Sequence, residues 1–383
     1  MEELIISTVD TCIQPQGLNK AALRIAYIGP RKGTSLHRAA ALERLGHAVS
    51  FVDPFDWMGR SVWMARWLHR GGAFGIGMKI DRPIFKAVRQ VAPDLIWVDQ
   101  GAYLGAGLIS KFRTLSVPIV NYTIDDPFGG RDGRRFDRYL RALPFYDLLV
   151  VVREENIAEA YALGARQVLR IWRSADEVAH RPRVLTDEDK HRWGSDVCFI
   201  GTWMPERGPF MAELVRAGLP LSIWGDRWQK APEWPVLAPY WRGPGQDDSE
   251  IYARIIQSAK ICLGLLSQGN RDRHTTRTFE IPAFGGLLCA ERTDEHCEAF
   301  QDGVEAVFWK DAQECIQQCR RLLNDDALIS AVKKNGHQRY LQSEHKNEAV
   351  LQDILNQVAS PNRKPNEHLG GSSIDAGTHQ PSF

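Results

Sequence analysis

The sequence predicts an α/β protein made of two doubly wound, parallel-sheet domains joined in tandem. Short apolar runs alternate with segments of helical spacing along most of the 383 residues. Such continuous apolar runs are typical of strands that helices cover on both faces. A polar, charged segment interrupts the alternation before it starts again. We therefore expect a first domain over residues 23–175, a linker over 176–195 and a second domain over 196–338.

The first half begins with the apolar run LRIAYI at residues 23–28, which ends at Gly29. The next residues change to helical spacing, with Leu36, Ala40 and Leu45 on one side. Helical patterns also separate the later apolar runs, so one parallel sheet is expected here. The further predicted strands are AVSFVD (48–53), DLIWVD (94–99), VPIVNYTIDD (117–126), YDLLVVV (146–152) and RQVLRIW (166–172).

The second half repeats this arrangement after the polar linker. Its predicted strands are DVCFIG (196–201), LSIWG (221–225), KICLGLL (260–266), GLLCA (286–290) and AVFWK (306–310). Helices are expected between these strands and then out to about residue 357, and the last one, about 340–357, can pack back on the first domain. The tail at 359–383 is rich in Gly, Ser, Pro and Asn, so it should be disordered.

The composition, 44% hydrophobic and 25% charged, is typical of a soluble globular protein. A net charge of +1 gives no global basic field, so we expect no nucleic-acid partner. The start MEELIISTVD has acidic residues where a secretory signal needs basic ones, and we expect a cytoplasmic protein. The segment WMGRSVWMARWLHR, residues 57–70, mixes Trp and Arg; it can lie on a membrane surface, pack on its own domain or meet an acceptor.

Doubly wound domains bind ligands at the carboxyl ends of their strands, so facing edges of two such domains would line one cleft. The segment SQGNRDRHTTRTFEIPAFGG, residues 267–286, is the richest of these edges. Thr275 or Thr276 can cap a helix whose N-terminus, with nearby arginines, suits phosphate. Glu280 is placed to accept hydrogen bonds from a ribose, and Arg277 to grip a phosphate. Alternatively, Arg277 and Glu280 pair with each other on a solvated face.

The edge of the first domain offers the loop Gly33, Thr34 and Ser35 and several candidates for a general base. Asp125 and Asp126 follow one predicted strand, and His37 starts the first helix. Asp126, which precedes Pro127, can also be a turn residue, and His37 can cap its helix or face solvent. The sequence contains no HxH, DxD or HExxH cluster, so we expect no metal site.

Three segments of the second half resemble the carboxyl-terminal domain of CgeB-like glycosyltransferases, a group similar to the large family 4 of GT-B enzymes. They are DVCFIGTWMPERGPFMAELVRAGLPLSIWGDRW, KICLGLL and RTFEIPAFGGLLCAERTDEHCEAFQDGVEAVFW. RIAYIGPRKGTSLHRAAALERLGHAV and NYTIDDP in the first half resemble the same group. The likeness covers roughly residues 23–345.

The resemblance implies a GT-B fold and a transferase that uses a nucleotide sugar and needs no metal or other cofactor. The donor would bind the second domain, and a glycan, protein or small-molecule acceptor would bind the first. Glu280 matches the acid that touches the donor ribose, and Arg207 a basic position near the diphosphate. Asp272 stands where the family has a glutamate, which leaves retaining and inverting outcomes both open. The expected donor-binding residues are Arg207, Arg277, Glu280, Gly201, Thr202, Arg273, Thr276 and Gly225, and the expected catalytic residues are Asp126, Asp125, His37 and Asp272.

Three other functions remain as alternatives. A nucleotide-sugar epimerase or a non-catalytic nucleotide-sugar-binding protein could share the same fold. A dehydrogenase would need a GxGxxG turn after the first strand, and the loop GPRKGTS lacks it. Binding of nucleoside diphosphates or of nicotinamide dinucleotides would separate these classes.

Overall fold

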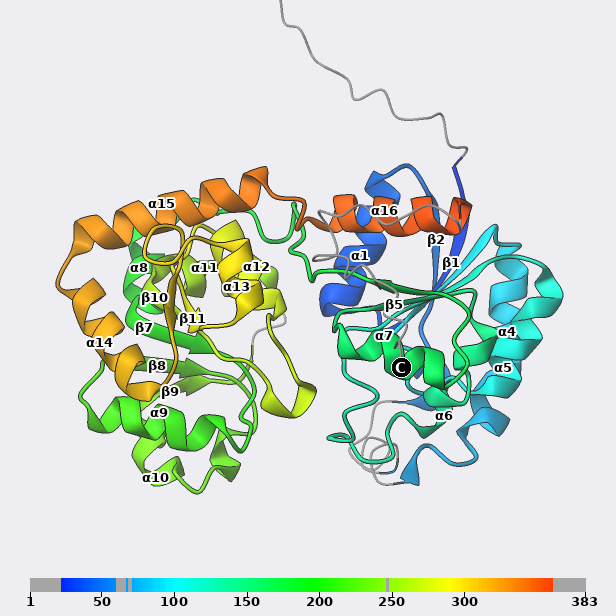
Figure 1. Ribbon diagram of the computed structural model, residues 1–383, viewed down its shortest axis with the longest axis horizontal. Helices are drawn as coiled ribbons and strands as arrows, with labels where there is room; N and C mark the ends of the chain where they lie inside the picture. The colour runs from blue at the N-terminus through cyan, green and yellow to red at the C-terminus, as the bar shows by residue number, and fades with distance from the viewer. Residues whose placement is uncertain (1–21, 60–66, 68–70, 246–247, 361–383) are drawn as a thin grey trace, which may run out of the picture.

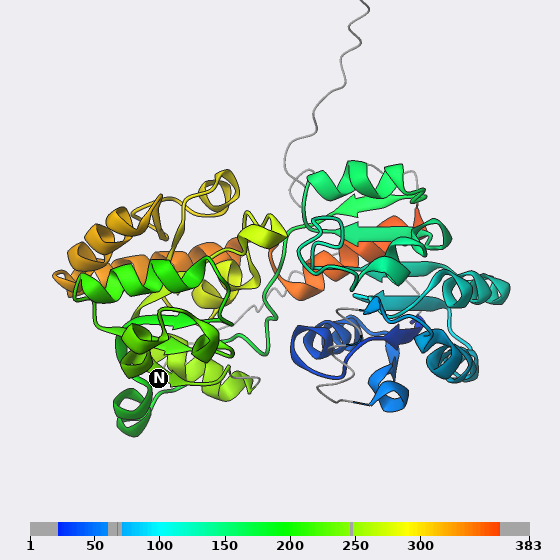
Figure 2. The ribbon, with the colours of Figure 1, turned by 90° about the horizontal axis from the view of Figure 1, so that it is seen from below.

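The computed structural model describes residues 22–59, 67, 71–245 and 248–360. The chain forms two domains, each built on a six-stranded parallel sheet with helices on both faces (Figures 1 and 2). The strand orders are β2-β1-β3-β4-β5-β6 and β12-β11-β10-β7-β8-β9. The predicted α/β class with two doubly wound parallel sheets is confirmed.

The first sheet is formed by strands that coincide with the predicted apolar runs. They are β1 (Arg24–Ile28), β2 (Ala48–Val52), β3 (Leu95–Asp99), β4 (Ile119–Tyr122), β5 (Leu148–Val151) and β6 (Val168–Arg170). Its helices are α1 (Gly33–Arg44), α2 (Phe55–Met58), α4 (Ile76–Val91), α5 (Ala106–Phe112), α6 (Asp137–Leu140) and α7 (Glu155–Ala162). Within β1, Ala26 and Ile28 join one core cluster and Ile25 and Tyr27 the other, so both faces of the sheet are buried.

The second sheet contains β7 (Ser195–Ile200), β8 (Leu221–Trp224), β9 (Trp241–Gly243), β10 (Ala259–Gly264), β11 (Leu288–Glu291) and β12 (Val307–Trp309). Its helices are α9 (Arg207–Arg216), α10 (Trp234–Leu237), α11 (Ser249–Ser258), α12 (Thr276–Ala283), α13 (Asp294–Ala299), α14 (Ala312–Leu323) and α15 (Asp326–Gln342). The edge strand β9 was not predicted, because its residues Trp241, Arg242 and Gly243 form no apolar run.

The segment expected as a linker contains a helix, α8 (Asp187–Trp193), which packs on α11. Thr186 caps α8, since its hydroxyl accepts a hydrogen bond from the Asp189 backbone N–H while the Asp189 carboxylate accepts from the Thr186 backbone N–H. Local capping therefore makes a helix of a segment that has no apolar face.

The chain returns to the first domain at its end. Helix α16 (Asn347–Ala359) lies against α1, and its Val350, Leu351 and Ile354 join the core beside Leu42 (Figure 1). The expected tail at 359–383 thus begins one residue inside α16, and residues 361–383 lie outside the described residues. Most of the basic aromatic segment 57–70 also lies outside them.

A loop of the second domain inserts into the first domain and holds the two together. Arg271 donates to Asp126 and to Glu159, while Asp272 accepts from Arg153 and Arg173. These ion pairs join loops that follow β4, β5 and β10, so the carboxyl edges of both sheets meet at one cleft. None of the helices in the described ranges is both long and apolar enough to cross a membrane.

Candidate functional site

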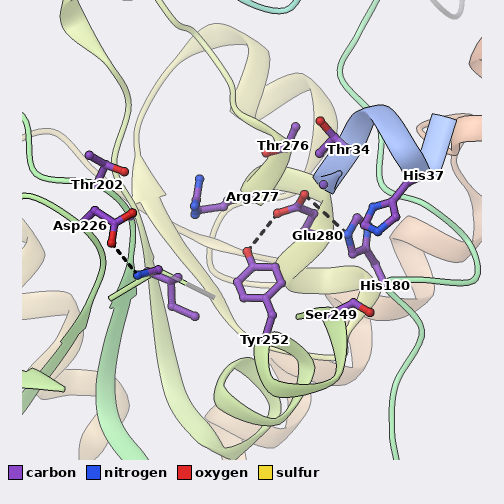
Figure 3. A pocket seen from close by; sticks show the side chains of 14 residues that line it. Thr34, His37, His180, Thr202, Asp226, Ser249, Tyr252, Thr276, Arg277 and Glu280 are labelled. Carbon is purple, nitrogen blue, oxygen red and sulfur yellow. Dashed lines mark hydrogen bonds and ion pairs between the residues drawn. The ribbon is translucent and has the colours of Figure 1, made fainter. Parts of the chain in front are cut away.

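A pocket of about 260 Å³ lies between the domains, where the starts of α1, α11 and α12 approach one another (Figure 3). It is lined from the first domain by the start of α1 and from the second by the loops after β7 and β8. The predicted site residues that line it are Gly33, Thr34, His37, Gly201, Thr202, Thr276, Arg277 and Glu280. His180, Ile200, Asp226, Gly245, Ser249 and Tyr252 complete its wall.

Helix α12 presents its N-terminus to this pocket. Thr275 is the N-cap residue, and its backbone N–H donates to the Thr278 hydroxyl at 3.0 Å. Thr276 and Arg277, in the first turn, and Glu280, one turn further on, then point toward the same space (Figure 3). Because free N–H groups and a positive dipole end lie at a helix start, this wall favours an anion.

Arg277 is half-buried and has no ion-pair partner among the described residues, and its Nε has no hydrogen-bond partner there. The alternative in which Arg277 pairs with Glu280 is therefore not what the structure has. Burial and then the charge of Arg277 lower the pKa of Arg207 to about 10. The second domain thus carries two neighbouring guanidinium groups beside the pocket, and neither has an ion-pair partner among the described residues.

Glu280 is 5% exposed, and the side chains of Tyr252 and His180 approach its carboxylate. The Tyr252 hydroxyl donates to Oε2 at 3.0 Å, and the His180 Nε2 lies 3.7 Å from Oε1. Burial and then the charge of Glu280 raise the pKa of Tyr252, so its hydroxyl stays a donor. A carboxylate has about four lone-pair positions, which leaves Glu280 room to accept from a ligand.

Arg207 begins α9 and is 7% exposed, but it does not line the pocket. Its guanidinium donates to the backbone oxygens of Thr202, Leu265 and Leu266. Arg207 therefore braces the loop that carries Gly201 and Thr202, which do line the pocket.

Gly225 supports this loop from behind and also lies outside the pocket wall. Its φ is 147°, and a Cβ there would lie 1.9 Å from the carbonyl oxygen of Gly201. Only glycine allows this approach, so Gly225 has a structural reason to be where the sequence suggested a ligand contact.

On the first-domain side, Gly33, Thr34 and His37 reach the pocket, whereas Ser35 is buried against Tyr27. Gly33 begins α1 with a φ of 52°, a conformation that glycine adopts without strain. Burial is the largest cause that lowers the pKa of His37. The His37 ring is therefore neutral at pH 7.

The acidic catalytic candidates lie outside the pocket. The Asp126 carboxylate accepts two hydrogen bonds from the Arg271 guanidinium, at 2.6 and 2.9 Å. Burial raises the pKa of Asp126, but the bonds from Arg271 and its other partners together outweigh burial, and the pKa is lowered. Asp125 pairs with Arg135 at 3.1 Å, and Asp272 lies between two buried arginines. Arg273, a predicted donor-binding residue, pairs with Glu155 at 2.9 Å. The structure thus does not bring Asp125, Asp126, Asp272 or Arg273 to the pocket.

Comparison with known structures identifies the architecture. The sucrose-phosphate synthase of Thermosynechococcus elongatus superposes with a TM-score of 0.63 at 12% identity, over 88% of this chain and 99% of that one. Anabaena HepE in complex with UDP and glucose gives a TM-score of 0.61 at 12% identity, also over 88% and 99%. The chain has the GT-B fold.

The GT-B fold is shared by proteins of different activity. A putative UDP-N-acetylglucosamine 2-epimerase from Listeria monocytogenes has a TM-score of 0.53 at 10% identity, over 91% of this chain and 100% of that one. Residues 207–356 match a family model described as glycosyl transferase-like. No curated protein matches the sequence. The family-model match spans most of the second domain and most of α16.

Among the pocket residues outside the predicted set, His180 and Tyr252 are the two that approach Glu280. His180 lies in the segment interpreted as a linker, and Tyr252 lies within an amphipathic helix, where an aromatic residue is typical of a core. Neither follows a strand, so the rule that led to the other site residues gave no signal for them.

Proposed function

We propose that the protein transfers a hexosyl or related sugar from a nucleotide-sugar donor to an acceptor, without a metal ion. The observation that carries the proposal is the wall formed by α12. Arg277, a guanidinium with no ion-pair partner among the described residues, and Glu280, a buried carboxylate that accepts from Tyr252, lie in one interdomain pocket at a helix N-terminus. A nucleoside diphosphate matches both charges, because it has acidic phosphates and a ribose with two hydroxyl donors.

The donor would bind with its ribose at Glu280 and its diphosphate at the start of α12. During transfer, the bond between the anomeric carbon and the diphosphate oxygen breaks, and negative charge grows on the leaving diphosphate. Arg277 and the N–H groups of α12 would stabilise this charge, since preorganised donors act most strongly where charge develops. Arg207 would keep the opposing loop, Gly201 and Thr202, in place.

The acceptor, a glycan, a protein or a small molecule, would enter from the first-domain side. Its hydroxyl oxygen bonds to the anomeric carbon, and the hydroxyl proton has to be taken up. Of the four predicted catalytic residues, His37 alone lines the pocket. Its lowered pKa keeps the ring neutral and able to accept that proton.

The comparisons support this reading. The family model described as glycosyl transferase-like matches the domain that contains Arg277 and Glu280. HepE, of the same fold, was solved with UDP and glucose and with UDP-glucose, so UDP and UDP-glucose are the first ligands to test. The resemblance to CgeB-like glycosyltransferases points the same way.

A nucleotide-sugar epimerase is the second candidate, because the Listeria protein shares the fold. It would use the same donor wall but would need no acceptor. A non-catalytic nucleotide-sugar-binding protein would bind the donor and release no nucleotide.

The test combines binding and turnover. Titration calorimetry with UDP, ADP, GDP and CDP should identify one bound nucleotide. Arg277→Ala should weaken the diphosphate more than the bare nucleoside, and Glu280→Gln should weaken both by about tenfold or more, since hydrogen bonds to a charged group contribute about 1.5–3 kcal/mol. Arg273→Ala is the control, because Arg273 lies outside the pocket. If no nucleotide binds, or if the control weakens binding as much as Arg277→Ala, the donor site is wrong. Nucleotide release that needs no acceptor would favour the epimerase.

A further inference from the structure

His180 lies deep in the pocket although it belongs to neither sheet. It is 4% exposed, and its ring lies between those of His37 and Phe284, with centroid distances of 5.1 and 5.3 Å. Figure 3 shows His180 next to His37, with its Nε2 directed at Glu280. A ring so enclosed has one orientation, and its two nitrogen atoms have distinct partners.

The partner of Nδ1 settles where the ring proton is. The backbone N–H of Asp176 donates to the His180 Nδ1 at 2.8 Å. A nitrogen that accepts a hydrogen bond bears no proton, so the neutral ring carries its proton on Nε2. That N–H faces Oε1 of Glu280 at 3.7 Å. This distance is longer than a hydrogen bond, so the N–H acts on Oε1 through its dipole, while the Tyr252 hydroxyl donates to Oε2 at 3.0 Å.

The turn that holds His180 is itself anchored. Asp176 is 2% exposed, and its carboxylate accepts from Arg44 of α1 at 2.9 Å and from Asn347 of α16 at 3.1 Å. Two backbone N–H groups, of Val178 and Ala179, donate to the same carboxylate. The His180 ring is thus fixed to the first domain, while Glu280 belongs to the second.

From these contacts we infer that His180 is a positioning residue, which holds the Glu280 carboxylate in the orientation that accepts the ribose hydroxyls of the donor. This inference rests on the proposed function. His180 does not touch the reacting atoms; it acts through Glu280. The ribose-binding carboxylate of the second domain is then oriented by a residue that the first domain holds in place.

Two variants test the roles of the two ring nitrogen atoms of His180 separately. In His180→Asn, the side-chain oxygen can replace Nδ1 and still accept from Asp176, but the side chain is too short to reach Glu280. In His180→Gln, the amide N–H can replace Nε2 and donate to Glu280, while the bond to Asp176 is lost. If His180 positions Glu280, His180→Gln should preserve nucleotide recognition better than His180→Asn. If His180 only stabilises its turn, His180→Asn should preserve it better.

The measurement is the preference for UDP over 2′,3′-dideoxy-UDP, taken from calorimetric Kd values with the full chain. Wild type should prefer UDP by about tenfold or more, because the dideoxy compound lacks the hydroxyls that Glu280 would accept. His180→Asn should lose most of this preference and His180→Gln should keep it, whatever their melting temperatures. If UDP is not the nucleotide that binds, the same pair is used with the base that the panel identifies.

Each of the other outcomes contradicts one step of the argument: the positioning role of His180, the ribose contact of Glu280 or the proposed function. If both variants keep the wild-type preference, if both lose it, or if Asn keeps it and Gln loses it, the Nε2 N–H of His180 does not position Glu280, and the donor site still stands. If wild type binds UDP without preferring it over the dideoxy form, Glu280 does not bind ribose and the positioning role falls with it. If wild type binds no nucleoside diphosphate, the proposed function fails as well.

Discussion

Replacing Asp272 by asparagine should destabilise the protein strongly and leave its chemistry intact. Asp272 accepts from Arg153 and from Arg173, the latter at 3.0 Å, and the three side chains are 5%, 3% and 7% exposed. Burial and then the charge of Arg173 lower the pKa of Arg153, which shows how poorly this site tolerates cations on their own. Asp272 belongs to the second domain and the two arginines follow strands of the first, so the variant also weakens the contact between the domains.

The expected size of the effect follows from burial. Removing one partner of a buried ion pair costs about 3–5 kcal/mol, because the remaining charge is left uncompensated. The asparagine oxygen can still accept one hydrogen bond, so we expect the lower end. For a domain of about 150–250 residues that unfolds as one unit, a loss of about 3 kcal/mol corresponds to a melting temperature roughly 6–12 °C below that of wild type.

Scanning calorimetry measures this shift, and Glu155→Gln is the matched control. Glu155 pairs with Arg273 across the same interface, but their side chains are 36% and 52% exposed. Exposed pairs contribute about 0–1 kcal/mol, so the control should melt within a few degrees of wild type. Turnover of Asp272→Asn, assayed well below its melting temperature, should stay near wild type. A variant that melts like wild type but has lost turnover would refute the structural reading and make Asp272 the catalytic acid that the resemblance implied.

Three further outcomes are expected. Burial among Phe279 and Trp172 lowers the pKa of His345 from 6.5 to about 4, so the unfolded chain binds a proton there that the folded chain does not. The free energy of unfolding should therefore fall as the pH is lowered from about 6.5 to 4. In urea unfolding over this range, His345→Gln should lose about 3 kcal/mol less of that free energy than wild type, at 1.36 kcal/mol per pKa unit. Equal losses in the two proteins would contradict this. Because the pKa of His37 is lowered too, kcat/KM should fall on the acid side of its pH profile only below pH 6.5. His37→Gln should abolish this acid-side fall. A fall centred above pH 6.5 would exclude His37 as the base. Turnover should survive EDTA, because Arg277 and the start of α12 supply the positive charge; activity lost to EDTA and restored by Mg²⁺ or Mn²⁺ would overturn this.

The fold could be predicted because its signal is local. The run LRIAYI contains β1, and KICLGLL contains all of β10 except its first residue, because a strand buried on both faces needs an unbroken apolar run. Helix α8 is the counterexample. Its residues DEDKHRW offer no apolar periodicity, and only the cap at Thr186 and its packing on α11 make it a helix.

The site could be predicted only where it obeys the same local rule. Thr202, Thr276 and Glu280 reach one pocket because each follows a strand end. Asp126 also follows a strand, yet its position is decided by Arg271, 145 residues away. Nothing near Asp126 in the sequence shows that partner, so a carboxylate that holds two domains together looks the same as one that performs catalysis.

One continuous segment performs both tasks in this protein. Its first part, Arg271 and Asp272, binds the first domain, and its second part, from Thr276 to Glu280, forms the wall of the proposed donor site. His180 adds a second connection from the first domain to the same carboxylate. The ion pairs and the donor wall are distinct in chemistry but belong to one segment, and for this reason nucleotide affinity and melting temperature have to be measured on the same variants.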